Sequence, residues 1–463
     1  MRKVFASRPT LTAAVLMVFL SACSGNGNLS PSANPPFAKP QDASTLVEQL
    51  SGSDTKIAHV IIIIQENRSF DNLFQGFPGA DTQSYGYTTS GKKIKLQPVG
   101  LQASWDVEHD SYGFFAACNG QGSYPGTDCL MNGFDNEYYS CGHSSQTPCP
   151  NANPPYSYVP HRETEPYFAM GEQYVLADRM FASNFDASSF VSHQYIIAAQ
   201  ANSRLNYPSG AWGCEGSPSD NIATVTQQRT IGNNVDVCLN DKTLGDELDK
   251  AGISWRFYTS EVYTDGGEWS PYSAVKHIYY GKDWSKDVIT PQTQFFTDVS
   301  HGKLPVVSWI TPTCENSDHA GCGSDAGPSW VASLVNAVGE SQYWKSTAIF
   351  VFWDDYGGWY DHVPPKLVDY DGLGFRLPLL IISPYAKQGY VSHVHYEHGS
   401  ILKFIEDRFA LPRLSASDKR ATSPEKDCFD FAQSPRSFKR IPSRYGMSYF
   451  IHQPLDRRPV DGE

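Results

Sequence analysis

The sequence lacks the basic surplus that a nucleic-acid-binding surface needs. Its 36 Lys and Arg residues are outnumbered by 49 Asp and Glu residues, which gives a formal net charge of −13 at pH 7. Proteins that bind a phosphate backbone present clustered positive charge, and no Lys/Arg run of this kind occurs. The composition therefore argues against nucleic acid as a partner and against an electrostatic patch for anionic membranes.

Long hydrophobic runs are missing beyond the first residues. The chain opens with MRKVFASRPTLTAAVLMVFLSAC, in which basic residues precede a short apolar run that ends in Leu-Ser-Ala before Cys23. A membrane-spanning helix needs about 20 apolar residues, so this run has the layout of a secretory signal. The small residues before Cys23 and the polar stretch after it indicate a bacterial lipoprotein signal over residues 1–23, with a plain cleaved signal as the alternative.

We therefore expect an exported protein that is anchored in a bacterial membrane through an acylated Cys23 and faces the periplasm or the cell exterior. Residues 24–55 are rich in Ser, Asn, Pro and Gly and are expected to form a flexible tether.

No C-x-x-C pair occurs among the ten cysteines, which disfavours a zinc cluster. With Cys23 set aside, eight of the other nine are close sequential neighbours, a usage that fits an oxidising compartment. Connectivity cannot be read from sequence, so proximity alone suggests the pairs. They are Cys118 with Cys129, Cys141 with Cys149, Cys214 with Cys238, and Cys314 with Cys322, which leaves Cys428 unpaired.

Uninterrupted apolar runs indicate the strands. Continuous burial on both faces is typical of a central strand in a parallel sheet, and KIAHVIIII at residues 56–64 has this character. Similar runs cover residues 253–258, 305–310, 348–353 and 377–382, and helical patterns cover 243–251, 329–338 and 400–409. The alternation predicts an α/β fold, a three-layer α/β/α sandwich with a mostly parallel central sheet.

Two segments break this alternation. Residues 102–162 are dense in Gly, Tyr, Asn, Pro and Cys without a sustained period, which predicts a disulfide-stapled excursion over the sheet edge. Residues 413–463 turn to Ser, Arg, Pro and Asp, and we expect a tail that packs on the core.

Polar residues follow two of the predicted strands abruptly. Glu66 and Asn67 follow the first apolar run, and Asp354 and Asp355 follow the run at 348–353. Ligands of open α/β folds bind at the carboxyl ends of strands, and adjacent carboxylates repel each other unless a cation or shared proton holds them. Their hard oxygen donors suit a divalent ion such as Mg, Ca, Mn or Zn. The alternative is a surface turn, since Asp-Asp before Gly-Gly is common in turns.

A serine and three histidines complete the candidate site. Ser189 lies near the start of a predicted helix, where free backbone N–H groups and the helix dipole attract phosphate, although an ordinary N-cap is the alternative. His109, His277 and His319 lie in or next to loops. Phosphoester cleavage needs hydrogen-bond donors and an acid for the leaving group, and a structural role is the alternative for each histidine.

Three motifs resemble one known family. HVIIIIQENRSFDNLF is similar to the opening signature of the bacterial phosphoesterase family, which includes non-haemolytic phospholipases C and related acid phosphatases. WDDYGGWYDHVPP resembles a later block of the family, and GFRLPLLIISPYAKQGYVSH followed by YEHGSILKFIE resembles its closing block. The agreement extends in order over about residues 57–412. It implies an alkaline-phosphatase-like catalytic domain over residues 56–412.

The resemblance also implies roles by position. Glu66, Asn67, Asp354 and Asp355 would bind one divalent metal ion, with Ser189 as nucleophile and further ligand.

Ser189 is aligned on a family pattern T-x-P-N-R-x-Y that reads SFVSHQY here. The missing Pro-Asn-Arg leaves the substrate class open and makes Ser188 a second candidate nucleophile. His109, His277 and His319 correspond loosely to histidines of the family's phosphate pocket, and His319 corresponds best.

The implied activity is metal-dependent phosphoester hydrolysis through a phosphoserine. A phosphomonoesterase of the acid phosphatase type is the first expectation, because the chain ends soon after the core blocks, and a phospholipase C that cleaves phospholipid head groups is the alternative. A non-catalytic surface-binding lipoprotein is less expected because both acidic pairs are intact. A sulfatase is disfavoured because no Cys/Ser-x-Pro-x-Arg element is present.

Overall fold

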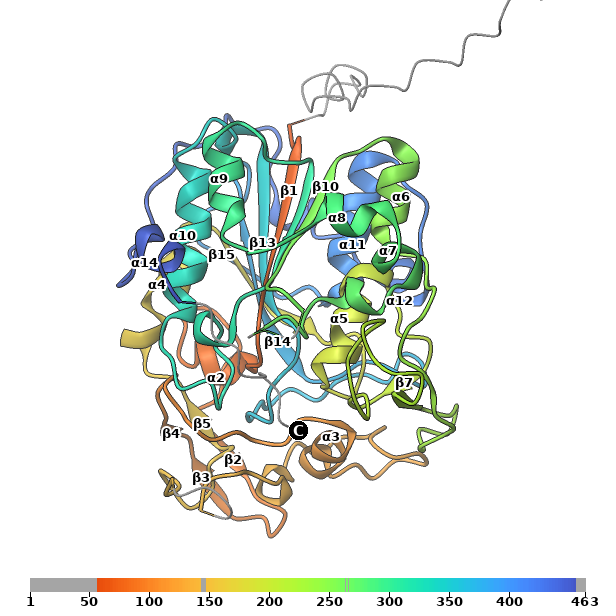
Figure 1. Cartoon of the computed structure of the whole chain (residues 1–463). Coiled ribbons are helices and arrows are strands. Elements are labelled where there is room, and N and C mark those ends of the chain that lie inside the picture. The colour runs from red at the N-terminus through yellow and green to blue at the C-terminus, as the bar shows by residue number, and fades with distance from the viewer. Residues whose placement is uncertain (1–55, 143–146, 263, 265, 455–463) are drawn as a thin grey trace, which may run out of the picture. The chain divides into compact units, whose positions relative to one another are not determined.

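A nine-stranded sheet organises the computed structural model, which describes residues 56–142, 147–262, 264 and 266–454 (Figure 1). The predicted signal with Cys23, the tether and the last nine residues of the predicted tail lie outside these residues. The strand order is β11-β10-β12-β1-β13-β14-β6-β15, and β16 also pairs with β6. The strands are β1 (His59–Gln65), β6 (Val175–Phe181), β10 (Trp255–Tyr258), β11 (Val288–Ile289), β12 (Val307–Ile310), β13 (Thr347–Trp353), β14 (Arg376–Ile382), β15 (Tyr390–Ser392) and β16 (Tyr396–Glu397).

The expected mostly parallel sheet is confirmed. β1 lies between β12 and β13 and is parallel to both, with Ile61 opposite Ser308 on one side and Ile349 on the other. All residues of β1 and β13 are buried, as their unbroken apolar runs predict. β14 departs from the parallel arrangement because it is antiparallel to both β13 and β6. Its first residue, Arg376, therefore lies at the edge where the other strands end.

Helices cover both faces of the sheet, which confirms the three-layer sandwich (Figure 1). One layer contains α4 (His161–Gln173), α9 (Gln294–Ser300), α10 (Gly327–Gly339) and the short α14 (Met447–Ile451). The other contains α5 (Ser189–Ala198), α6 (Leu244–Ala251), α7 (Lys276–Tyr279), α8 (Lys282–Asp287), α11 (His398–Phe409) and α12 (Ala416–Arg420). None of the described helices has the length and apolar character needed to cross a membrane.

Strand β6 was not predicted, because its sequence VLADRMF is interrupted by two charged residues. Asp178 is nevertheless buried, where it accepts hydrogen bonds from the backbone N–H of Asp81 and from Nδ1 of His393. These partners lie far away in the chain, so a local apolar pattern does not reveal the strand.

Short elements make up residues 102–162, namely α3 (Ser111–Cys118), the 3-10 turn η1 (Phe134–Asn136) and β5 (Ser157–Tyr158). All four expected disulfides are present, Cys118–Cys129, Cys141–Cys149, Cys214–Cys238 and Cys314–Cys322, and Cys428 is a buried free thiol. The zinc alternative for these cysteines is therefore wrong. The other short elements are α2 (Phe70–Phe74), β2 (Tyr85–Tyr87), β3 (Lys93–Lys95), β4 (Gln97–Pro98), β7 (Arg204–Leu205), β8 (Asn221–Thr224), β9 (Val235–Asp236), η2 (Pro271–Ala274), η3 (Cys314–Asn316) and η4 (Trp344–Ser346).

The described part of the C-terminal segment, residues 413–454, packs against the core. It contains α12, α13 (Glu425–Cys428) and α14. The indole Nε1 of Trp344 donates to the carbonyl oxygen of Arg436 at 2.7 Å, and the Phe438 ring packs edge-on against the same indole. Phe450 of α14 contacts Trp330 of α10 in the same way.

A buried ion pair fixes the start of β14. The Arg376 guanidinium donates from Nε and Nη2 to both carboxylate oxygens of Asp361, at 3.1 Å each, and also lies 3.4 Å from Oδ1 of Asp71. All three side chains are fully buried. Asp361 comes from the segment after β13, so this pair joins the antiparallel strand to the loop that follows Asp354 and Asp355.

We predict that Arg376→Met lowers the free energy of unfolding by about 3–5 kcal/mol, because it leaves the buried Asp361 carboxylate without its cation, whereas Asp71 keeps His362 as a partner. Urea unfolding followed by tryptophan fluorescence measures this loss. The matched control is Arg440→Met, which removes an ion pair with Glu340 whose two side chains are 60% and 50% exposed. The control should cost less than about 1 kcal/mol, and equal losses in the two variants would contradict the assigned role of Arg376.

Candidate active site

The two predicted strand exits meet in space. β1 and β13 are parallel neighbours in register through Gln65 and Trp353, so Glu66 and Asp354 leave the sheet side by side. One histidine lies between them, since Nε2 of His193 is 2.8 Å from Oε1 of Glu66 and 3.5 Å from Oδ2 of Asp354. The ligand-type atoms of these three residues all lie within 4.8 Å of one another.

The acidic pair after β13 does not form a surface turn, because Asp354 and Asp355 are 0% exposed. The backbone N–H of Gly357 donates to Oδ1 of Asp355 at 2.7 Å. Gly357 has a φ of +60°, and a Cβ there would lie 2.3 Å from the carbonyl oxygen of Asn67. Glycine is therefore required at this position by both backbone conformation and space, and the turn packs the two strand exits together.

Three of the four predicted metal ligands use one side-chain atom in a hydrogen bond. Glu66 Oε1 accepts from His193, Asp355 Oδ1 accepts from Gly357, and Asn67 donates through Nδ2. Asp354 Oδ2 lies 3.5 Å from Nε2 of His193, an ion-pair distance. Among the described residues, no hydrogen-bond partner exists for Glu66 Oε2, Asn67 Oδ1, Asp355 Oδ2 and both oxygens of Asp354. Buried oxygens without partners are costly, and hard oxygens from four residues suit a divalent cation. We name these four residues the oxygen cluster.

The charge of the oxygen cluster also fits a cation. Burial raises the pKa of Glu66 and that of Asp355 well above their ordinary values, and the neighbouring Asp354 raises both further. Burial lowers the pKa of His193, but Glu66 and Asp354 outweigh this effect and raise it to about 10. Among the described residues, no Lys or Arg forms an ion pair with the three carboxylates. One imidazolium offsets only one of three negative charges, so a divalent ion fits the balance.

Ser189 lies beside the oxygen cluster. It is the first residue of α5, and its Oγ accepts a hydrogen bond from Asn67 Nδ2 at 3.4 Å. Ser188, not Ser189, occupies the N-cap position, so the ordinary N-cap interpretation of Ser189 is wrong. The Ser188 hydroxyl donates to Oδ1 of Asp186 at 2.8 Å and contacts the carbonyl oxygen of Asn206 at 3.1 Å. Ser188 is therefore engaged elsewhere.

Two of the three predicted histidines lie at this site. His109 Nε2 accepts from Asn67 Nδ2 at 2.9 Å, while its Nδ1 donates to the carbonyl oxygen of Val107 at 2.7 Å. The His319 ring lies 5.7 Å from the His109 ring between centroids, and its Nδ1 donates to the carbonyl oxygen of Ala320. Asp106 adds a carboxylate within 4.8 Å of ring nitrogens of both histidines.

The end of β1 also positions the loop that carries His319. The Gln65 side chain donates to the carbonyl oxygen of Asn316 and accepts from the backbone N–H of Asp318, both at 3.0 Å. The buried Asp318 carboxylate accepts from Tyr167 Oη at 2.7 Å, and burial raises its pKa to about 6. The strand that delivers Glu66 therefore sets the path of the histidine loop as well.

His277 is placed elsewhere. It lies on the exposed side of α7, where its ring nitrogens contact Oδ1 of Asn240 and Oδ1 of Asp246, each at 2.7 Å. Asp246 belongs to the capping box of α6. Among the described residues, no hydrogen bond or ion pair joins His277 to the oxygen cluster or to Ser189.

The sequence analysis missed His193. A signal was present, because His193 follows Ser189 by four residues on a predicted helix, a spacing that places two side chains on one face. The motif SFVSHQY marks Ser189 by its spacing to Tyr195 and gives no role to the histidine between them.

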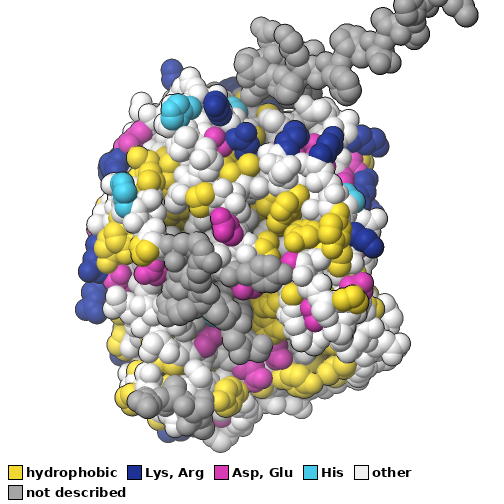
Figure 2. Space-filling model, viewed as in Figure 1, with side chains coloured by type: hydrophobic (Ala, Val, Ile, Leu, Met, Phe, Trp, Pro, Cys, Tyr) yellow, Lys and Arg dark blue, Asp and Glu magenta, His cyan; other side chains and the backbone are white. Residues whose placement is uncertain are grey.

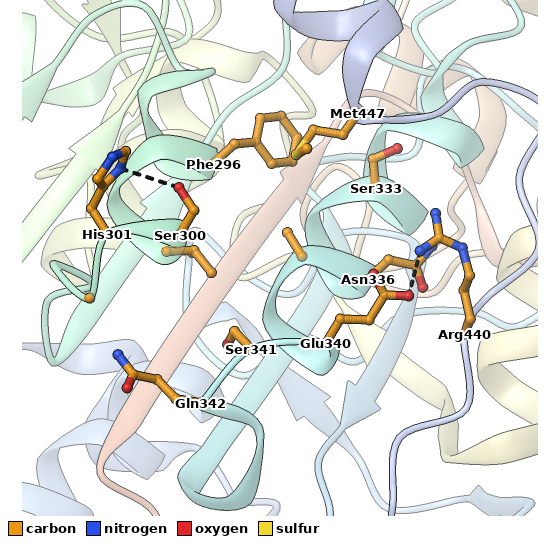
Figure 3. Close-up of a pocket in the computed structure, with 13 residues that line it drawn as sticks. Phe296, Ser300, His301, Ser333, Asn336, Glu340, Ser341, Gln342, Arg440 and Met447 are labelled. Atoms are coloured by element: carbon orange, nitrogen blue, oxygen red, sulfur yellow. Dashed lines mark hydrogen bonds and ion pairs between the residues drawn. The ribbon is translucent and has the colours of Figure 1, made fainter.

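A hollow of about 700 Å³ between α9, α10 and the C-terminal segment is separate from the site (Figure 3). Two of its polar side chains are paired, since Asn336 bonds the backbone of Ile441 and Arg440 pairs with Glu340. It shares no residue with the oxygen cluster. On the face shown in Figure 2, Lys and Arg side chains lie mainly along the upper margin and the two sides, and Asp, Glu and apolar side chains are scattered over the lower half.

Similar proteins of known name are phospholipases C. Phospholipase C B of Mycobacterium tuberculosis is 24% identical over 454 residues, which cover 84% of this chain and 80% of that protein. Hemolytic phospholipase C of Pseudomonas aeruginosa is 25% identical over 422 residues, covering 80% and 55%. Non-specific phospholipase C1 of Arabidopsis thaliana is 24% identical over 425 residues, covering 82% and 72%.

Solved structures with a related fold include a protein in the alkaline phosphatase superfamily from Vibrio parahaemolyticus, with a TM-score of 0.35, 11% identity, and coverage of 81% of this chain and 77% of that one. The PsFucS1 sulfatase from Pseudoalteromonas matches with a TM-score of 0.39, 10% identity, and coverage of 85% and 76%. The sequence model of the Phosphoesterase family matches residues 57–412, the region in which the oxygen cluster, Ser189 and both site histidines lie. The chain therefore belongs to the Phosphoesterase family and is a hydrolase of phosphoester bonds.

Proposed function

We propose that the chain hydrolyses its substrate through Ser189 with the help of one divalent cation held by the oxygen cluster. The observation that carries the proposal is the position of Asn67. Its amide nitrogen contacts the hydroxyl of Ser189 at 3.4 Å, while its oxygen belongs to the oxygen cluster. A nucleophile and a cation site are thereby joined through one side chain.

The serine would act as the nucleophile. The Ser189 hydroxyl gives up its proton to solvent, and Oγ forms a bond to phosphorus as the bond from phosphorus to the leaving-group oxygen breaks. The oxygen of a water molecule then bonds to phosphorus as the bond to Ser189 Oγ breaks, which returns the proton to the serine. A cation bound by the oxygen cluster would lower the pKa of the hydroxyl and neutralise charge on the phosphoryl oxygens. As the first residue of α5, Ser189 also has the free N–H groups of the helix start nearby, which attract anionic oxygens.

The two histidines would have different tasks. His109 is engaged at both ring nitrogens, by Asn67 and by Val107, and thereby orients the Asn67 amide. His319 donates its Nδ1 proton to a backbone carbonyl, which makes Nε2 the atom that exchanges protons. We therefore propose that His319 is the residue that protonates the leaving group.

A phosphodiester of the phospholipid head-group type is the substrate that we propose. Among the described residues, no Lys or Arg pairs with the oxygen cluster, and Arg68 places its guanidinium over the Trp359 ring, 4.6 Å from the centroid. A site so poor in fixed positive charge suits a singly charged diester better than a doubly charged monoester. The names of the similar phospholipases C support the same choice. A phosphomonoesterase of the acid phosphatase type is the second candidate.

Export and membrane attachment belong to the same proposal. The four disulfides support an oxidising compartment. An acyl chain on Cys23 would place the hydrolase next to phospholipid, and this anchor stays a prediction.

We predict that Ser189→Ala lowers kcat at least about 10³-fold, since it removes the nucleophile. Ser188→Ala is the matched control, and it should keep activity because the Ser188 hydroxyl bonds Asp186 and Asn206. Hydrolysis assays measure both rates, and mass spectrometry of acid-quenched protein locates the phosphoserine. Phosphate found on Ser188 would move the nucleophile to that residue.

We predict that chelation with EDTA abolishes activity and that the resulting loss of stability grows with pH. Folding raises the pKa of Glu66 above 4.5 and that of Asp355 above 3.8, so their favourable contribution to the metal-free fold is lost as pH rises through the raised values. A cation at a hundredfold excess over its Kd adds about 2.7 kcal/mol. The gap in Tm between loaded and chelated protein should therefore be wider at pH 8 than at pH 5.

The matched variant for this experiment is Asp355→Asn, which removes one of the crowded carboxylates. Its chelated form should melt higher than chelated wild type at pH 8, while its affinity for the cation falls. A Tm gap that does not change with pH would contradict the assignment of the oxygen cluster as the cation site.

We predict that bis-p-nitrophenyl phosphate is cleaved with a kcat/KM at least about tenfold higher than p-nitrophenyl phosphate, or about 1.4 kcal/mol in transition-state stabilisation. The two substrates share a leaving group, and the diester has one negative charge less and one aryl ester more than the monoester. Phosphatidylcholine in mixed micelles then tests the lipid. A ratio in favour of the monoester, together with slow lipid cleavage, would select the acid phosphatase type.

A further inference from the structure

His193 joins the helix of the nucleophile to the oxygen cluster. It follows Ser189 by four residues on α5, so both side chains lie on one face of the helix. The side chain is 1% exposed, and its Nε2 lies 2.8 Å from Glu66 Oε1 and 3.5 Å from Asp354 Oδ2. Three elements distant in sequence, the exit of β1, the exit of β13 and the start of α5, therefore meet at one ring nitrogen.

We infer that His193 is a positioning residue of the cation site, which donates its Nε2–H to one oxygen of Glu66, turns the other oxygen of Glu66 toward the cation, and attracts Asp354 at ion-pair distance. The inference rests on the proposed function and adds to it a residue that neither binds the cation nor touches the substrate.

The division of the oxygens supports this role. The 2.8 Å separation is that of a hydrogen bond from an N–H to a carboxylate. Glu66 Oε2, the atom opposite the one that faces His193, has no hydrogen-bond partner among the described residues, and neither oxygen of Asp354 has one. A carboxylate fixed at one oxygen presents the other in a defined direction, which is how residues around a metal site orient its ligands.

The other ring nitrogen argues against His193 as a ligand. A metal-bound imidazole almost always donates its second N–H to an acceptor, and Nδ1 of His193 has no hydrogen-bond partner among the described residues. The acceptor that usually accompanies a histidine ligand is therefore missing among the described residues.

A pair of variants separates the two roles. His193→Gln places an amide N–H near the position of Nε2, and His193→Asn places it near Nδ1, away from Glu66. His59→Gln is the matched control, because His59 is a buried histidine like His193. It is the first residue of β1, at the end of the strand far from Glu66, and its Nδ1 lies 2.8 Å from the carbonyl oxygen of Pro305.

The Kd of Mn²⁺ is measured by calorimetry on the full chelated protein, after thermal unfolding has shown that each variant is folded. We expect His193→Asn to raise the Kd about 10–100-fold, and His193→Gln and His59→Gln to bind near the wild-type value. With Mn²⁺ saturating, kcat should fall in His193→Asn while KM for the substrate stays close to wild type, because Ser189 shifts against the oxygen cluster.

Pulsed electron paramagnetic resonance of Mn²⁺ gives the opposing test. A directly bound nitrogen that is present in wild type and absent from both His193 variants would make His193 a ligand and overturn the inference. So would an unchanged Kd in His193→Asn, or an equal rise in His59→Gln. If His193→Asn does not fold, the Kd and spectrum of His193→Gln decide between rescue and loss.

The Kd of Mn²⁺ and the resonance spectrum are both measured without substrate turnover. An active Ser189→Ala protein would overturn the proposed nucleophile while leaving the Mn²⁺ results for His193 interpretable, so the two failures can be distinguished.

Discussion

The structure depends on keeping three carboxylates together in a buried place. Glu66, Asp354 and Asp355 are fully buried. One oxygen of Glu66 and one of Asp355 each accept a hydrogen bond from an N–H donor, and Asp354 lies at ion-pair distance from His193. Repulsion among them would open the site if nothing fixed their directions. The donors to Glu66 and Asp355 use one oxygen of each carboxylate, so the other oxygen is available to a cation. The contacts that orient these buried carboxylates therefore also define the cation site.

The sheet makes this arrangement possible. Parallel neighbours end at the same edge, so two strands separated by nearly the whole domain deliver their following residues to one point. The antiparallel β14 contributes differently, because it begins at that edge and brings Arg376 to Asp361, beyond the acidic pair. A strand that ended there would bring its C-terminal residue instead. The one reversal in the order therefore places a buried guanidinium behind the turn that follows Asp355.

The sequence predicts five strands of the sheet and the acidic pairs of the site, but it does not predict β6 or the position of His277. Unbroken apolar runs predict β1, β10, β12, β13 and β14, because a strand that is buried on both faces has apolar residues at consecutive positions. β6 is not predicted, because Asp178 interrupts its apolar run and the partner that allows its burial, His393, lies far away in the sequence. The acidic pairs were found because polar residues after a buried strand stand out. His277 is a candidate by its loop position and by a loose correspondence to the family's histidines, and burial, which distinguishes it from His109 and His319, cannot be predicted from either.

His193 shows why a motif that has changed is hard to interpret from sequence. The family pattern has Arg at this position, and the absence of Pro-Asn-Arg suggests a lost element. In the fold, position 193 faces Glu66 and Asp354 on the same helix face as Ser189. The imidazole supplies an N–H donor to Glu66 at this place, and a guanidinium is a donor of the same kind. A changed letter in the motif therefore does not by itself mean that the donor is lost.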